Sequence, residues 1–149
     1  KSETDQETAV INFTNNSKEK WIFGKIRNVL NGSGTCILTY GPIIKLAFEV
    51  KQNIKEKISI YSCHTLKPFD DKRVKTIMKK YEKILVLEDH SKIGGLSEII
   101  LAEGYKNKYQ GQIISFSLKD QFINCYGSQS DLQEKHGISV KKIIKSMKK

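Results

Sequence analysis

The chain has 149 residues, a length suited to one domain that can bury a core without metal or disulfide support. Its 26 basic residues outnumber the 16 acidic ones, and the net charge of +10 on its own admits nucleic acid as a partner. The longest apolar runs fall far short of the roughly 20 residues of a membrane span, and residues 1–8 are too polar for a signal peptide. The sequence therefore predicts neither a membrane protein nor a secreted one.

The basic charge is spread along the chain instead of forming a nucleic-acid site. Lysines are scattered, the one dense run is residues 141–149, and Arg27 and Arg73 are the only arginines. Base readout and bidentate phosphate contacts favour arginine. No helix-turn-helix, RNP or zinc-finger pattern occurs, so we expect a solvated lysine surface and no nucleic-acid partner.

The cysteines and histidines predict neither disulfides nor a metal site. Cys36, Cys63 and Cys125 are widely spaced and form no Cys-x-x-Cys pair, which indicates a reducing compartment and a cytoplasmic location. The three histidines are isolated from one another and from paired carboxylates, so the ligand spacing of a structural zinc site is missing.

Taken in chain order, the sequence begins with a polar segment, residues 1–19, that we interpret as a linker or mobile arm. Residues 21–30 indicate an extended edge segment, closed by an Asn-Gly-Ser-Gly turn. Short apolar runs then predict strands at 36–39, 58–61, 84–87 and 113–116. Between and after them, helical faces are expected at 43–54, 70–81, 96–100, 130–136 and 139–147. This alternation predicts a three-layer α/β/α fold with a mostly parallel sheet of about five strands.

The candidate site is the segment Glu-Asp-His-Ser-Lys-Ile-Gly-Gly-Leu at residues 88–96, which follows a buried strand and opens a helix. Ligands in open α/β sheets bind at the carboxyl ends of strands, and glycines at a helix start bring backbone N–H groups close to an anion or a neighbouring chain. We therefore expect an anion-binding or interface turn. Its members are Asp89, His90, Ser91, Lys92, Gly94 and Gly95.

Hydrolytic chemistry is disfavoured at both histidine-bearing segments. Neighbours on one loop, such as Asp89, His90 and Ser91, rarely point at one another, whereas catalytic triads assemble from distant segments. Cys63 and His64 follow a strand, and adjacent residues on an extended segment project to opposite sides. We expect structural roles for both sets of residues. His90 should hydrogen-bond within its turn or across an interface.

Five ordered segments resemble the C-terminal domain of the transketolase family of thiamine-diphosphate enzymes. They are residues 21–32, 36–41, 64–70, 87–96 and 127–139. The acid-His-Ser-x-x-Gly-Gly pattern is the most specific of them. Two positions depart from the family pattern, because Tyr40 stands where a smaller residue is commoner and Ser97 replaces a glycine. By this resemblance, residues 20–149 are a transketolase C-terminal-like domain.

The resemblance implies that thiamine diphosphate and Mg²⁺ belong to the complete enzyme and are bound by preceding domains. The chain would then hold no catalytic residue, bind no cofactor or metal itself, and serve structure, assembly or regulation. Its partners would be those cofactor-binding domains or a subunit that carries them, in a homodimer of the complete enzyme. The chain alone would be inactive.

The resemblance leaves the activity of the complete enzyme open. The His90–Ser91 pair favours a transketolase, a transferase that moves two-carbon ketol units between sugar phosphates. A deoxyxylulose-phosphate synthase or the β subunit of a 2-oxoacid dehydrogenase E1 is the alternative within the family. A stand-alone binding domain without catalysis is the alternative outside it.

Overall fold

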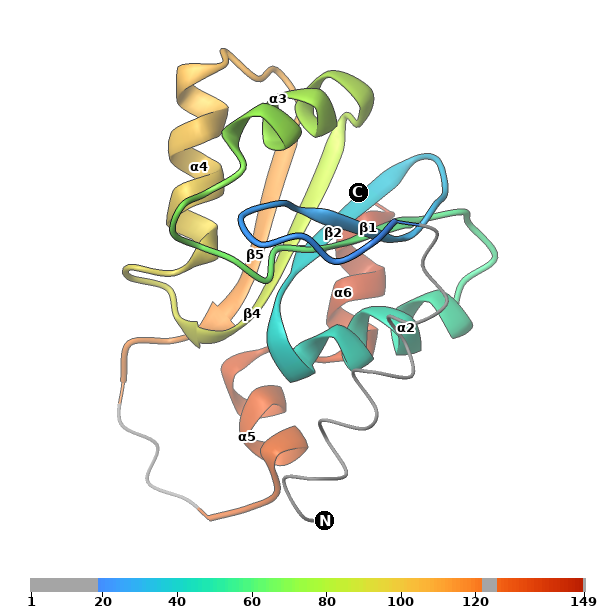
Figure 1. The fold of residues 1–149 in the computed structure, drawn as a ribbon. Coiled ribbons are helices and arrows are strands. Elements are labelled where there is room, and N and C mark those ends of the chain that lie inside the picture. The colour runs from blue at the N-terminus through green and yellow to red at the C-terminus, as the bar shows by residue number, and fades with distance from the viewer. Residues whose placement is uncertain (1–18, 122–125, 149) are drawn as a thin grey trace.

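The computed structural model describes residues 19–121 and 126–148 (Figure 1). Strands and helices alternate along most of this part of the chain, as the apolar pattern predicted. The strands are β1 (Arg27–Leu30), β2 (Thr35–Thr39), β3 (Ser59–Ser62), β4 (Lys83–Ser91) and β5 (Gln112–Leu118). The helices are the 3₁₀ turn η1 (Gly41–Ile43), α2 (Ile44–Gln52), α3 (Asp71–Lys80), α4 (Leu96–Lys106), α5 (Gln129–His136) and α6 (Val140–Met147). None of these helices is long and apolar enough to cross a membrane.

The strands form one five-stranded sheet in the order β1-β3-β2-β4-β5. The pairs β2–β3, β2–β4 and β4–β5 are parallel, whereas the edge strand β1 is antiparallel to β3. The expected mostly parallel sheet of about five strands is confirmed. Only the last four residues of the expected edge segment 21–30 pair as a strand.

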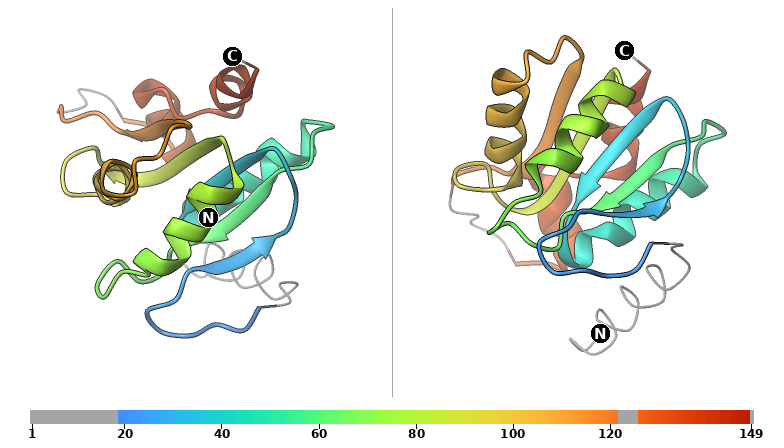
Figure 2. Two further views of the ribbon diagram at one scale, coloured as in Figure 1. Left: turned by 90° about the horizontal axis from the view of Figure 1, so that it is seen from above. Right: turned by 45° about the horizontal axis from the view of Figure 1, so that its top comes forward.

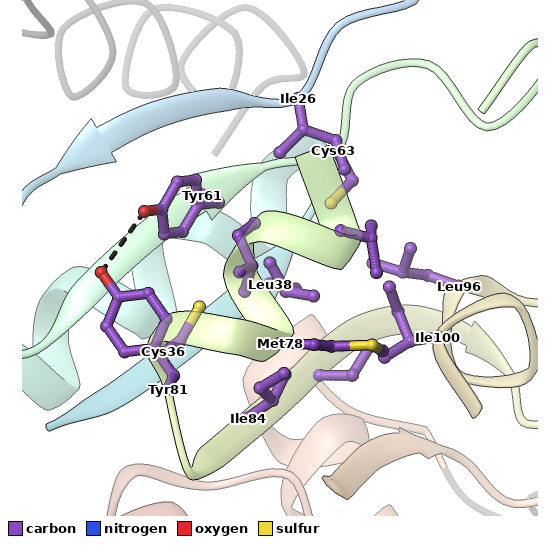
Figure 3. Close-up of a cluster of buried hydrophobic side chains, with 13 residues drawn as sticks. Ile26, Cys36, Leu38, Tyr61, Cys63, Met78, Tyr81, Ile84, Leu96 and Ile100 are labelled. Atoms are coloured by element: carbon purple, nitrogen blue, oxygen red, sulfur yellow. Dashed lines mark hydrogen bonds between the residues drawn. The ribbon is translucent and has the colours of Figure 1, made fainter. Parts of the chain in front are cut away.

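Helices cover both faces of the sheet, because successive side chains of a buried strand point to opposite faces. In β2, Cys36 and Leu38 pack with α3 and α4, whereas Ile37 packs with α2 and α6. Ile84–Leu87 of β4 divides in the same way between the two cores. Figure 2 shows the helices on the two sides of the sheet, and Figure 3 shows the core on the α3 and α4 side. The three-layer prediction is confirmed.

Local capping fixes where the helices begin. Asp70 precedes α3, and its carboxylate accepts hydrogen bonds from the backbone N–H groups of Arg73 at 3.2 Å and Ile26 at 3.1 Å. The predicted acidic helix start is confirmed, and it also ties α3 to the segment before β1. Ser128 and Asp131 form a capping box at α5. Ser139 precedes α6 as expected, but its side chain makes no capping hydrogen bond.

Strand β4 ends later than the sequence predicted. It does not stop at Leu87 but continues through Ser91. Leu87 pairs with Phe116 and Ser91 with Leu118, so β4 advances four residues while β5 advances two. This bulge keeps residues 88–91 in the strand and exposes Asp89 and His90 to solvent.

The linker or mobile arm expected over residues 1–19 lies, apart from Glu19, outside the described residues. Glu19 itself contacts the domain, because its side chain accepts a hydrogen bond from the backbone N–H of Asn28 at 2.7 Å.

Candidate functional site

The candidate site lies at the carboxyl end of the sheet, where β2, β3, β4 and β5 all end (Figure 1). The chain leaves β2 toward β3 on one side, whereas β4 lies on the other side of β2. Such a reversal of strand order is where open α/β sheets place their ligands. Tyr40 follows β2 at this point, and burial, together with the charges of Glu88 and Asp89, raises the pKa of its hydroxyl.

Glu88 is the central polar group of the turn, and it was not among the predicted site residues. Its side chain is fully buried, and its carboxylate accepts hydrogen bonds from the backbone N–H groups of Leu96 at 2.6 Å and Ser97 at 3.1 Å. A carboxylate at these N–H groups also interacts favourably with the positive end of the α4 dipole. The bulge of β4 and the start of α4 therefore bring the anion and its donors together within the chain.

The two glycines have different roles. Gly94 has φ +76°, a conformation that L side chains rarely adopt, and its N–H donates to Glu98 Oε2 at 2.9 Å. A Cβ on Gly95 would lie 2.2 Å from Glu88 Oε2, so only glycine lets the carboxylate reach the helix start. The sequence left the N–H groups at this helix start for a neighbouring chain or an anion, but those of Leu96 and Ser97 already donate to Glu88 within the chain.

Asp89 and His90 project from the bulge and are exposed. Asp89 accepts a hydrogen bond from the Gln129 side chain of α5. His90 Nδ1 lies 2.8 Å from the Ser91 carbonyl oxygen, so His90 makes the bond within the turn that the sequence predicted. Because these side chains contact their own strand or α5, they form no nucleophile and base pair.

Ser91 and Lys92 close the turn. Ser91 Oγ accepts a hydrogen bond from the N–H of Ile93 at 3.3 Å, and the N–H of Lys92 donates to the carbonyl oxygen of Leu118 at 3.1 Å. Lys92 and Ile93 are both exposed. An exposed turn that satisfies its own hydrogen bonds can serve as an interface, and that half of the expectation stays a prediction.

Cys63 is a core residue and no nucleophile. Its side chain is fully buried, its N–H donates to the Thr39 carbonyl oxygen at 2.7 Å, and burial, assisted by the charge of Asp70, raises the pKa of its thiol. A raised pKa keeps the thiol protonated, and the thiolate is the reactive form. The structural role predicted for Cys63 is consistent with this environment.

His64 belongs to a second constellation at the same end of the sheet, which the sequence reasoning missed. His64 Nε2 lies 3.0 Å from the carbonyl oxygen of Ile22, and its ring is 5.1 Å from the Trp21 ring. A cavity of about 340 Å³ opens here. It is lined by Trp21, Arg27, Tyr40, Gly41, Ile44, Ser62 and His64. The two rings come from segments more than 40 residues apart, so no local pattern could have indicated the pair.

The described residues do not fit a metal ion. Within residues 19–121 and 126–148, no group of three or more His, Cys, Asp or Glu residues could hold a metal ion. The buried carboxylate that could have contributed, Glu88, is already bound by backbone N–H groups. The carboxyl end of the sheet presents aromatic, aliphatic and polar side chains.

Comparison with known proteins gives the family. The family model described as transketolase, C-terminal domain, matches residues 24–143. The chain belongs to this family. Residues 87–96, the most specific of the five segments that carried the resemblance, lie within the match. The fold is similar even where the sequence identity is low. A split-gene transketolase, solved as an inactive tetramer of four beta subunits, superposes on this chain with a TM-score of 0.76 at 18% sequence identity. The superposition covers 87% of this chain and 43% of the transketolase chain.

Several curated relatives share one name. A 1-deoxy-D-xylulose-5-phosphate synthase of Cytophaga hutchinsonii is 26% identical over 133 residues, which are 87% of this chain and 21% of the relative. The enzyme of the same name from Bacteroides fragilis is 31% identical over 130 residues, or 85% of this chain and 20% of the relative. The transketolase C-terminal domain described here thus spans about a fifth of the length of these relatives.

Proposed function

We propose that this domain is the C-terminal part of a thiamine-diphosphate-dependent enzyme that forms 1-deoxy-D-xylulose 5-phosphate. The observation that carries the proposal is the shared name of relatives that are 26% and 31% identical across more than four fifths of the chain. This was the alternative in the sequence analysis, where the His90–Ser91 pair favoured a transketolase. His90 makes only a local bond to the Ser91 carbonyl oxygen, so the pair has no visible bearing on that choice.

In this proposal the domain contributes structure and assembly, whereas cofactor and substrates bind elsewhere in the enzyme. Two features support that division. Glu88 occupies the helix N-terminus that could otherwise have bound a phosphate, and Cys63 is buried with a raised thiol pKa. The relatives are about five times as long as the matched segment, which leaves ample chain for cofactor-binding domains and for a homodimer contact.

The test is an assay of the complete enzyme, with thiamine diphosphate and Mg²⁺ supplied. Formation of 1-deoxy-D-xylulose 5-phosphate is expected, and two-carbon ketol transfer between sugar phosphates should be slower by orders of magnitude. The reverse ranking would favour a transketolase. If the chain is found with no cofactor-binding polypeptide, it is a stand-alone domain and the proposal fails.

A further inference from the structure

An apolar segment stands exposed at the carboxyl end of the sheet. Trp21, Ile22 and Phe23 are consecutive, and their exposed fractions are 60%, 57% and 63%. Single exposed apolar residues are ordinary on protein surfaces, but contiguous groups of them mark interaction sites. Trp21 is also the only tryptophan in the chain, a residue type enriched at interface hot spots.

Hydrogen bonds connect this segment to the residues that follow β3. The Ile22 carbonyl oxygen is 3.0 Å from His64 Nε2, and the N–H of Gly24 donates to Thr65 Oγ1 at 3.2 Å. Gly24 makes the turn with φ +72°, which favours glycine. The three apolar side chains are therefore presented by a turn anchored to the segment after β3. A preorganised surface loses little conformational entropy when a partner binds it.

A cavity lies beside the segment, between Trp21, Tyr40 and His64, and its volume of about 340 Å³ leaves room for one side chain. His64 is held there by its Nε2, which donates a hydrogen bond to the Ile22 carbonyl oxygen, a group that can only accept. The rings of Trp21, Tyr40 and His64 give the cavity an aromatic lining, which suits an apolar side chain.

We propose that Trp21, Ile22, Phe23 and the His64 cavity, together called the docking surface, bind the cofactor-binding part of the same enzyme. The inference rests on the proposed function and names the surface through which the domain would act. Its occupant follows from chain length, because the curated relatives and the split-gene transketolase all carry more than half of their residues outside the match. An apolar side chain from that part would enter the cavity.

The opposite end of the sheet provides an internal control surface. Residues 51–57, which end α2 and lead toward β3, lie at the amino end of the parallel strands and include Lys51, Lys55, Glu56 and Lys57. This charged and largely exposed segment has no contiguous apolar group. It should stay open to solvent in the complete enzyme.

Hydrogen–deuterium exchange on this chain alone and on the complete enzyme tests the proposal. Amides of residues 62–66 should exchange at least tenfold more slowly in the complete enzyme, whereas those of residues 51–57 should not change. Residues 62–66 are the decisive peptide, because they include His64 of the docking surface and lie far in sequence from the apolar segment. Replacing Phe23 with Asp should abolish the protection of 62–66. The matched change Tyr105→Asp, on a side chain of α4 that is 91% exposed, should preserve it.

The outcomes separate the two proposals. If the complete enzyme protects another surface of the domain and leaves 62–66 unchanged, the docking surface is wrong and the proposed function stands. The docking surface is equally wrong if Phe23→Asp and Tyr105→Asp behave alike. If no cofactor-binding part accompanies the chain, the proposed function and the docking surface fail together. Circular dichroism of each variant alone establishes that the domain is folded before exchange is compared.

Discussion

Replacing Gly95 with alanine tests the buried contact that shapes the start of α4. The new Cβ would lie 2.2 Å from Glu88 Oε2, and its three nearest neighbours are all atoms of the Glu88 carboxyl group. That carboxyl group would have to leave the N–H groups of Leu96 and Ser97, which it binds at 2.6 and 3.1 Å. Hydrogen bonds to charged groups contribute about 1.5–3 kcal/mol each, so the loss of two should lower the free energy of unfolding by at least about 3 kcal/mol.

Gly94→Ala is the matched control for this substitution. No atom lies within 4 Å of its added Cβ, so only the left-handed backbone conformation at φ +76° opposes it. That conformation costs an L residue about 1–2 kcal/mol. Urea unfolding followed by circular dichroism gives both values, provided that the slopes of the unfolding curves agree.

A double-mutant cycle makes the test sharper. In a Glu88→Ala background the atoms that oppose the Gly95 Cβ are gone, so Gly95→Ala should cost less than about 1 kcal/mol there. The interaction free energy between the two positions would then be about 2 kcal/mol or more, within the range seen for residues in contact. An equal cost of Gly95→Ala in both backgrounds, or a cost no greater than that of Gly94→Ala, would refute the close-approach explanation.

Three further outcomes are expected from the same structure. The Cys36 and Cys63 thiols, whose pKa values burial raises, should react with a thiol reagent at pH 8 only after unfolding; mass-spectrometric detection of rapid labelling in the folded chain would contradict this. Hydrogen bonds from the Ser128 side chain and backbone hold the pKa of Asp131 below its ordinary value of 3.8. Because of this shift, the support that Asp131 gives α5 is present above pH 4 and is lost as pH falls through the folded-state pKa. An NMR titration should show that Ser128→Ala raises this pKa. Thr39→Val should raise the free energy of unfolding by about 1 kcal/mol, because Thr39 Oγ1 is buried without a hydrogen-bond partner among the described residues. A lower melting temperature of the variant would contradict the unpaired burial of this hydroxyl.

The strands and helices could be predicted because their signals are local. The continuous apolar run at 84–87 indicated a strand covered on both faces, and burial in two separate cores follows from the alternation of side chains. For α6 the pattern placed Val140, Ile143, Ile144 and Met147 on one face. It could not show that Ile143 alone of these is fully buried, because that depends on how the helix packs against α2 and the sheet.

The chemistry of the site depended on contacts that no local pattern reveals. The acid at position 88 was visible in the sequence, but its burial depends on the bulge in β4 and on the close approach of Gly95. For that reason the sequence indicated N–H groups open to an anion or a neighbouring chain where the fold supplies its own carboxylate. The Trp21–His64 contact joins two distant segments, so it required the three-dimensional structure.

Calorimetric titration of thiamine diphosphate with Mg²⁺ tests the central claim most directly, namely that this domain serves an enzyme whose cofactor site lies elsewhere. The titration is performed on this chain alone and on the complete enzyme under identical conditions. We expect saturable binding to the complete enzyme and no saturable heat with the chain. Saturable binding to the chain alone would contradict the claim.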